Sequence, residues 1–228
     1  MEPRVPVVSI DGPSGSGKGT VSRRVARHAG WHLLDSGALY RLVALAGQRE
    51  GLAADDVLGH ARLAGLMQVE FGAGADDAER VLLDGADVTA ALRSEAAGQG
   101  ASRVAAWPDL RAALLQRQRD FARPPGLVAD GRDIGTVIFP AAPLKIFLTA
   151  SAEERAARRH KQLKDKGSAD SLAALSREIA ERDQRDATRS VAPLRPAEDA
   201  IVIDSTARSV ESVVEQVVEL GRARGLWP

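Results

Sequence analysis

The segment Gly12-Pro-Ser-Gly-Ser-Gly-Lys-Gly-Thr20 has the residue types and spacing of a loop that binds phosphate groups. Its glycines let successive backbone N–H groups point towards phosphate oxygens. Lys18 can reach the β- and γ-phosphates of a nucleotide, and a hydroxyl next to such a lysine can bind Mg²⁺. Here Gly19 stands where the hydroxyl usually lies, so we assign the magnesium role to Thr20. The alternative is a glycine-rich turn without a ligand.

A second polar cluster, Asp130-Gly-Arg-Asp133, directly follows the apolar segment Leu127–Ala129. If that segment is a parallel strand, the cluster lies at its carboxyl end, where α/β sheets bind their ligands. Asp130 could then hold a magnesium ion and its waters, and Arg132 could donate two parallel hydrogen bonds to a phosphate. The alternative is a surface Asp–Arg turn, which the neighbouring phosphate loop makes less attractive.

Within Leu172–Arg189, five residues follow one another at spacings of 4, 3, 4 and 3, which is one stripe on a helix. The stripe begins apolar and ends with two arginines and an aspartate. Charged residues that continue a buried face need partners, and a net positive charge there suits an anionic ligand. The alternative is a solvated helix end beyond the core. The five residues are Leu175, Ile179, Arg182, Asp186 and Arg189.

Another basic group lies on the helical segment Ala152–Lys166, which is followed by Gly167-Ser168. This group could close over the phosphates of ATP, or it could be an ordinary solvated helix face. The sequence leaves both alternatives open, and it leaves open which arginine would act. The members are Arg155, Arg158, Arg159, Lys161, Lys164 and Lys166.

These residues have to be positioned by strands and helices that alternate along the chain. Short apolar segments, often β-branched, predict buried parallel strands at Val5–Ile10, Trp31–Leu34, Leu127–Ala129, Leu144–Leu148 and Ile201–Ile203. Longer periodic segments predict helices at Gly19–Ala29, Leu110–Ala122, Ala152–Lys166, Leu172–Thr188 and Val210–Ala223. The alternation predicts an α/β fold with helices on both faces of a parallel sheet.

Two local signals refine this prediction. Ser151-Ala-Glu-Glu154 has the form of a capping box at the start of a helix. The segment Gly51–Ala106 is rich in Ala, Gly and Asp and contains two weak strands, Val69–Phe71 and Arg80–Leu83, the second followed by the turn dipeptide Asp84-Gly85. We therefore expect an inserted subdomain there.

Composition limits the possible functions. Among 228 residues, Lys+Arg and Asp+Glu both number 31, and this zero net charge disfavours binding to nucleic acid or anionic membranes. The chain contains no cysteine, so disulfides and thiolate metal sites are excluded. The first six residues lack the features of a signal peptide, and the chain has no run of about 18 apolar residues. We expect a cytoplasmic protein without a membrane segment.

Four motifs, which occur in family order and span nearly the whole chain, resemble the bacterial cytidylate kinase family. They are Asp11-Gly-Pro-Ser-Gly-Ser-Gly-Lys-Gly-Thr20, Leu34-Asp-Ser-Gly-Ala-Leu-Tyr-Arg41, Asp130-Gly-Arg-Asp-Ile-Gly-Thr136 and Glu181-Arg-Asp-Gln-Arg-Asp-Ala-Thr-Arg189. The resemblance implies an α/β P-loop fold of three layers with a five-stranded parallel sheet. It implies core segments at 1–36, 107–151 and 171–228, a monophosphate-binding insertion at 37–106 and a small lid at 152–170.

The resemblance also implies ATP-dependent phosphorylation of CMP and dCMP to CDP and dCDP by in-line transfer in the presence of Mg²⁺. For ATP it implies binding by Gly12, Ser14, Gly15, Ser16, Gly17, Lys18, Gly19, Thr20 and Arg158. For the magnesium ion it implies Thr20 and, through water, Asp130. For the cytosine nucleotide it implies Ser36, Tyr40, Arg41, Ser102, Arg111, Arg132, Asp133, Arg182, Asp186 and Arg189.

The residues expected to act in the transfer itself are Lys18, Arg132, Arg158, Arg182, Asp186 and Arg189. The acceptor would be a phosphate oxygen that is already anionic, so positioning and charge neutralisation suffice without a strong general base. The expected partners are ATP and CMP or dCMP, with no nucleic acid and no membrane, and we expect a monomer.

Three other functions are alternatives. The first is a kinase for shikimate or a sugar acid on the same scaffold, which the residues implied to read cytosine disfavour. The second is a GTP-dependent switch, but its guanine-reading Asn-Lys-x-Asp motif cannot occur in a chain without asparagine. The third is a nucleic-acid-binding module, which the zero net charge disfavours.

Overall fold

The computed structural model describes residues 5–73, 79–165 and 171–228, and these residues form two compact units. Unit 1 comprises residues 5–35 and Gln118–Pro228, and unit 2 comprises Ser36–Arg117. Each unit has a sheet of its own. Unit 2 extends further towards the C-terminus than the predicted insertion at 37–106, because most of the helix after that insertion belongs to it.

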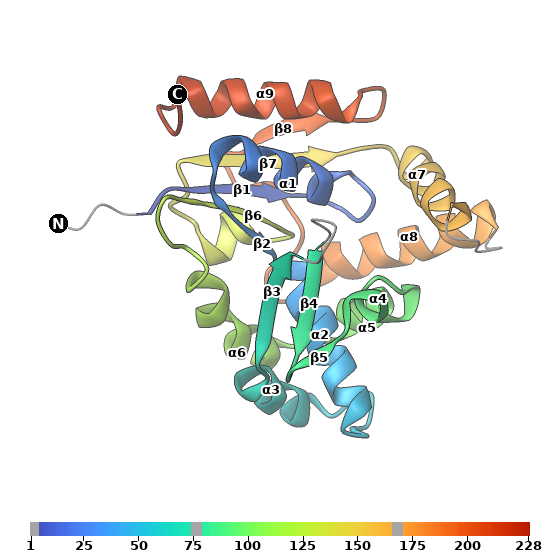
Figure 1. Cartoon of the computed structure of the whole chain (residues 1–228). Helices are drawn as coiled ribbons and strands as arrows, with labels where there is room; N and C mark the ends of the chain where they lie inside the picture. Colours follow the sequence, from blue (N-terminus) through green and yellow to red (C-terminus); the bar gives the residue numbers. More distant parts are fainter. Residues whose placement is uncertain (1–4, 74–78, 166–170) are drawn as a thin grey trace. The chain divides into compact units, whose positions relative to one another are not determined.

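The sheet of unit 1 has five parallel strands, as predicted, and their order is β2-β6-β1-β7-β8 (Figure 1). The strands are β1 (Val7–Asp11), β2 (His32–Asp35), β6 (Leu127–Gly131), β7 (Leu144–Thr149) and β8 (Ile201–Asp204). Each strand ends one or two residues beyond the apolar segment that predicted it, because the residues after that segment continue the backbone pairing between strands. In register, Asp11 lies opposite Gly131 and Asp35 lies opposite Asp130, so these polar residues gather at one sheet edge.

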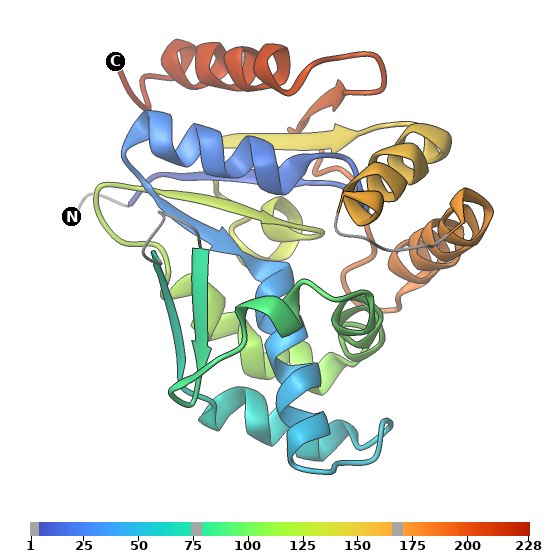
Figure 2. The same cartoon turned by 45° about the vertical axis from the view of Figure 1, so that its right-hand side comes forward.

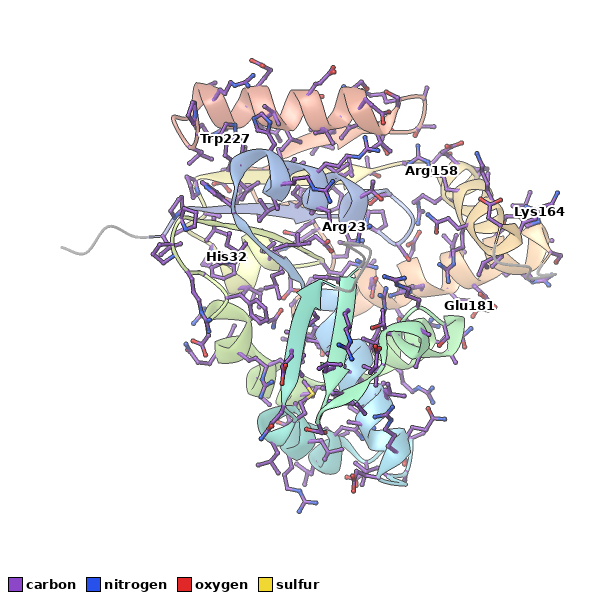
Figure 3. The ribbon with its side chains drawn as sticks, viewed as in Figure 1. Arg23, His32, Arg158, Lys164, Glu181 and Trp227 are labelled. Carbon is purple, nitrogen blue, oxygen red and sulfur yellow. The ribbon has the colours of Figure 1, made fainter. Side chains whose placement is uncertain are left out.

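Two helices, α1 (Lys18–Ala29) and α9 (Val210–Ala223), pack against each other and against this sheet (Figure 1). Their valines form the core with β1 and β7; among them Val25 and Val217 are fully buried. The C-terminus closes the same core, because Trp227 lies edge-on to Trp31 at 5.2 Å and donates from Nε1 to the carbonyl of Val218 at 3.0 Å. Figure 3 labels Trp227 near α9.

Helices α7 (Ala152–Lys164) and α8 (Leu172–Thr188) lie side by side in both views (Figures 1 and 2). The predicted end of α7 at Lys166, the exit Gly167-Ser168 and the last part of the lid at 166–170 lie outside the described residues. Half of the expected capping box forms: Ser151 Oγ accepts from the amide of Glu154 at 3.2 Å. The other half does not, because Glu154 pairs with Arg158 and the amide of Ser151 donates to Thr206.

Unit 2 contains an antiparallel sheet in the order β3-β4-β5 and most of the helices that the apolar pattern did not predict. The predicted turn at Asp84-Gly85 is present, with φ of +50° and +80°. Helix α6 begins at a proline, which favours the first turn of a helix, and not at Leu110. The elements are α2 (Ser36–Arg49), α3 (Val57–Leu66), β3 (Val69–Ala73), β4 (Glu79–Leu83), β5 (Ala86–Asp87), α4 (Thr89–Leu92), α5 (Glu95–Val104) and α6 (Pro108–Arg119).

A short π-helical segment, η1 (Ile134–Ile138), follows β6 in unit 1 and packs against β1. Ile134 and Ile138 are both buried, so this segment forms part of the core directly behind the cluster Asp130-Gly-Arg-Asp133. Within the described parts of the chain, none of the helices has the length and apolar character needed to cross a membrane.

Candidate active site

The loop between β1 and α1 has positive φ at Gly12, Gly15 and Gly17, a backbone conformation that side chains disfavour. A side chain at Gly12 would collide with the carbonyl oxygen of Leu148 on β7. Gly15 has φ of +79°, which side chains disfavour, and a Cβ there would lie 3.0 Å from Cβ of Arg155. The loop therefore passes close to β7 and α7, and its backbone amides at the helix N-terminus can bind an anion.

Lys18, the first residue of α1, lies among positive charges. Its Nζ donates to the carbonyl of Pro13 at 3.1 Å. The pKa of Lys18 is lowered to about 7, first by burial and then by the charge of Arg132, with a smaller contribution from Arg182, while the carboxylate of Asp130 opposes the shift. Lys18, Arg132 and Arg182 repel one another, and a bound anion would relieve this repulsion. The electrostatic environment of Lys18 therefore suits phosphate groups.

Asp130 at the end of β6 is buried and its carboxylate lies against the first turn of α1. A Cβ at Gly19 would lie 3.6 Å from Oδ2 of Asp130, so the glycine leaves the space next to that carboxylate open. Carboxylate and hydroxyl oxygens are ligands that Mg²⁺ accepts, and Thr20 follows Gly19 directly. Among the described residues no group of three His, Asp or Glu could bind a metal ion alone. The Asp130 carboxylate beside Gly19 is a hard oxygen donor of the kind that Mg²⁺ takes together with phosphates and water.

Arg132 from the turn after β6 meets Asp186 from α8. Arg132 Nε donates to Asp186 Oδ2 at 2.8 Å, and the side chains are 16% and 4% exposed. Burial alone would raise the pKa of Asp186, but the charges of Arg132, Arg189 and Arg182 and the hydrogen bond from Arg132 hold it below its usual range. The carboxylate therefore stays ionised beside three guanidinium groups.

The stripe on α8 faces inward, as its spacing predicted. Leu175, Ile179, Asp186 and Arg189 are buried, and Arg182 is half-buried. The structure thus brings Arg132 together with the charged end of the stripe, although the two segments are 54 residues apart in sequence. The roles of these residues towards a nucleotide remain predictions.

The arginines of α7 have protein partners. Arg155 is buried and donates to the carbonyls of Ala150 at 3.0 Å and Ser14 at 3.1 Å. It also donates two parallel hydrogen bonds to Asp183 on α8, at 3.0 and 2.6 Å. Arg155 therefore ties the phosphate loop to both helices, and this contact disfavours a role over the transferred phosphoryl group.

Arg158 lies on the next turn of α7, beside the phosphate loop (Figure 3). It donates to Glu154 at 2.8 Å, to the carbonyl of Ser205 at 2.6 Å and to the carbonyl of Ser16 at 3.4 Å. It remains 25% exposed, so it can still reach a ligand on the loop. Lys161 and Lys164 are exposed, as in an ordinary solvated helix face, and Figure 3 shows Lys164 at the end of α7 away from the sheet.

In unit 2 the predicted acceptor-binding residues come from three helices. Tyr40 on α2 and Arg111 on α6 lie together, with Arg111 Cζ 5.7 Å from the centroid of the Tyr40 ring. Arg111 also donates to the carbonyl of Ala105 at 3.1 Å, which fixes the guanidinium. Ser102 on α5 is buried. Ser36 is buried at the start of α2, and Arg41 is half-buried. Asp133 belongs to unit 1, where it is buried and precedes η1.

Sequence reasoning missed three residues that hold this site together. Asp183 and Ser205 are partners of Arg155 and Arg158, and Asp11 accepts from the amides of Ile134 and Gly135 after Asp133. Asp183 follows Arg182 and lies beside the stripe, so only the packing of α7 against α8 shows its role. Ser205 directly follows β8, and its hydroxyl donates to the carbonyl of Ser16 at 3.1 Å. A polar residue at the carboxyl end of a strand was the one signal available for Asp11 and Ser205.

Comparison with known proteins agrees with this geometry. The family described as cytidylate kinase matches residues 8–223. Proteins named cytidylate kinase from Pseudomonas paraeruginosa and Stutzerimonas stutzeri are 57% identical over 220 residues and 58% identical over 215 residues, covering 96% and 94% of both chains. An uncharacterized protein from Eubacterium ventriosum shares the fold, with a TM-score of 0.52 and 13% identity over 96% of this chain and 99% of that chain. The family indicated by the four motifs is thereby confirmed: the chain belongs to the cytidylate kinase family.

Proposed function

We propose that the protein transfers the γ-phosphoryl group of ATP to the phosphate of CMP and dCMP. A phosphate oxygen of the acceptor forms a new bond to the γ-phosphorus, and the bond from that phosphorus to the β,γ-bridging oxygen breaks. The products are ADP and CDP or dCDP. The observation that carries the proposal is the convergence of Lys18, Arg132 and Arg182 at the carboxyl edge of the sheet.

Two anionic substrates repel each other, so a site for their reaction needs excess positive charge. The glycine loop provides backbone amides and Lys18 for the donor. Arg132, Arg182 and Arg189 all act on the charge of one carboxylate, Asp186, and would place their guanidinium groups near the acceptor phosphate and the transferred group. Electrostatic stabilisation and positioning are the main catalytic needs of phosphoryl transfer, and these residues supply both.

A magnesium ion would be held by Thr20 and, through water, by Asp130, and it would neutralise charge on the β- and γ-phosphates. Arg158 would contact the phosphates from α7. Asp186 holds Arg132 in place through its hydrogen bond, so the guanidinium needs no reorganisation when the substrates bind.

The base of the acceptor would be recognised by Asp133, with Ser102 and Arg111. Cytosine presents an amino group where uracil presents a carbonyl oxygen, and a carboxylate accepts from the amino group. Against uracil the carboxylate would face another acceptor, and a site built around a hydrogen bond strongly rejects an analogue that lacks it. We therefore propose that CMP and dCMP are good substrates and that UMP is poor. Ser36, Tyr40 and Arg41 would contact the monophosphate.

A coupled assay of ADP release with a panel of acceptors tests this proposal. The panel contains CMP, dCMP, UMP, shikimate and gluconate, each with ATP and Mg²⁺. We expect rapid ADP release with the two cytosine nucleotides alone. Faster turnover of shikimate or gluconate would show that the chemistry belongs to a small-metabolite kinase.

Lys18→Ala is the matched loss-of-function variant, and Lys164→Ala, a substitution of an exposed lysine on α7, is its control. We also propose that the protein acts in the cytoplasm as a monomer. Light scattering after size-exclusion chromatography, with and without nucleotides, tests whether the protein is a monomer.

A further inference from the structure

Asp11 is the last residue of β1 and directly precedes the phosphate loop, yet none of the proposed roles uses it. Its side chain is buried. Oδ1 accepts from the amide of Ile134 and Oδ2 accepts from the amide of Gly135, both at 2.8 Å. These are the first two amides after Asp133, so both carboxylate oxygens hold the backbone at the exit of the Arg132–Asp133 turn.

The same turn is held closely from β1 by packing. A Cβ at Gly135 would lie 2.7 Å from Oγ of Ser9 and 3.4 Å from Oδ2 of Asp11, so the backbone approaches the strand as nearly as glycine allows. Neither Asp11 nor its two amide donors can shift without disturbing this contact. Asp11 thus joins the start of the donor loop to the turn that carries two predicted acceptor residues.

The carboxylate is an unfavourable choice for stability alone. Burial is the largest influence on Asp11 and raises its pKa to about 6, and the neighbouring Asp133 adds to the shift. The two backbone hydrogen bonds and the charge of Lys18 act against it without cancelling it. Costly buried groups of this kind are concentrated at functional sites.

We propose that Asp11 is a positioning residue for the acceptor nucleotide, because its two hydrogen bonds set where Arg132 and Asp133 stand relative to the phosphate loop. This inference rests on the proposed function, since it concerns the residues that hold the acceptor phosphate and base. Asp11 itself touches neither substrate, and its effect passes through the backbone of residues 133–135.

A carboxylate can accept from both amides at once, whereas a carboxamide of the same shape has one acceptor oxygen. Asp11→Asn would therefore keep one hydrogen bond and direct its NH₂ group at the other amide. The backbone should move away at that amide. This movement would displace Asp133 and Arg132 from their positions relative to the phosphate loop. Loss of a residue that orients a functional group typically lowers activity about 10- to 100-fold.

The test is a steady-state comparison of wild type, Asp11→Asn and the control Asp56→Asn. Asp56 accepts from the amide of Gly59 at 2.8 Å at the start of α3, so its substitution also changes a carboxylate bound to a backbone amide. For Asp11→Asn we expect kcat/KM for CMP to fall about 10- to 100-fold. We expect KM for ATP to stay within about threefold and the ratio of kcat/KM for CMP and UMP to narrow, while Tm falls because a buried amide loses its acceptor. Asp56→Asn should leave all four quantities unchanged.

An unchanged kcat/KM for CMP in a folded Asp11→Asn protein overturns the inference. Equal losses of kcat/KM for CMP and UMP also overturn it, because they indicate a structural role alone. The proposed function fails separately, if wild type does not prefer CMP to UMP. If Asp11→Asn does not fold, amide hydrogen exchange in the nucleotide-free wild type tests the inference instead. The inference requires slow exchange at the amides of Ile134 and Gly135, and fast exchange at either amide contradicts it.

Discussion

Helices α7 and α8 are neighbours with similar numbers of arginines, yet they use those arginines differently. On α7, Arg155 and Arg158 donate to backbone carbonyls and to two carboxylates, Asp183 and Glu154. Arg182 on α8 and Arg189, which directly follows α8, act on the charge of one carboxylate that also binds Arg132. The described contacts of Arg155 and Arg158 are with protein groups, whereas Arg132, Arg182 and Arg189 act on the charge of the same carboxylate, Asp186.

This difference teaches that the partners of a basic residue indicate its role better than the density of basic residues does. The sequence alone could not separate a closing lid from a solvated face on α7. The structure shows a third possibility for Arg155, which is to tie the phosphate loop to α8. The following predictions test whether α8 acts on the substrate while Arg155 of α7 acts on the framework.

The largest effect is expected for alanine substitutions of Arg182, Asp186 and Arg189. Each should lower kcat/KM for CMP by about two to three decades, because preorganised charge near the transferred group is lost. Asp186→Ala should matter although it removes a negative charge, since Asp186 orients Arg132. Affinity for ATP alone should stay within a few-fold, as measured by titration calorimetry.

The control for these three variants is Lys164→Ala, which removes a charge from the exposed part of α7 and should change kcat/KM by less than about twofold. A lower Tm with unchanged specific activity in all three variants would show that the stripe is structural. It would contradict the proposed difference between the two helices.

A smaller change is expected for Asp133→Ala. The variant should narrow the ratio of kcat/KM for CMP and UMP by about 10- to 100-fold, because one discriminating hydrogen bond to the base contributes that much. The substitution should lower kcat/KM for CMP and leave the already low kcat/KM for UMP nearly unchanged. Asp120→Ala, at an exposed position directly after α6, serves as control. An unchanged ratio would remove Asp133 from base recognition.

For Arg155→Ala we expect a loss of stability with a modest effect on chemistry. The side chain is 6% exposed and its partner Asp183 is 29% exposed, so removing the guanidinium leaves a partly buried carboxylate without its pair. Stability should fall by about 2–3 kcal/mol, somewhat less than for a fully buried pair. Urea unfolding measures this, and Arg155→Ala/Asp183→Ala should lose less than the sum of the single variants. A strongly reduced kcat at unchanged stability would instead make Arg155 a catalytic residue.

The smallest expected effect is the uptake of a proton by Lys18 when MgATP binds. Because the pKa of free Lys18 is lowered to about 7, the amine is mostly neutral at pH 8 and mostly charged at pH 6. Bound phosphates favour the charged form, so MgATP binding should take up about one proton at pH 8 and roughly none at pH 6. Calorimetry in buffers of different ionisation enthalpy measures the uptake. Lys18→Arg, whose guanidinium stays charged, should show no uptake at either pH.

Much of the fold could be predicted because the buried parallel strands are continuous apolar runs. The bounds of α8 were also predictable, since Ser171 caps the helix and its apolar positions are regularly spaced. Helix α2 was missed because it begins directly after β2, at Ser36, without a loop to mark the boundary. Its small residues, such as Ala38 and Gly47, also weaken the periodic contrast between faces.

The site could be predicted in part for a similar reason. Glycines and Lys18 in the loop follow a local pattern, because adjacent residues meet the same phosphates. The pairs Arg132–Asp186 and Arg155–Asp183 join elements that are distant in sequence, and no spacing rule indicates which arginine meets which aspartate. Asp11 stood within a recognised motif, but its two amide donors become visible only when η1 is packed against β1.

The most direct test of the proposed reaction is ³¹P NMR of wild-type protein with ATP, Mg²⁺ and CMP. Direct transfer predicts that ADP and CDP appear in equal amounts, with no inorganic phosphate beyond that formed by a sample without CMP. Replacing CMP by UMP should leave ATP nearly unchanged over the same time. Formation of ADP and inorganic phosphate without CDP, or equal turnover of UMP, would contradict the account.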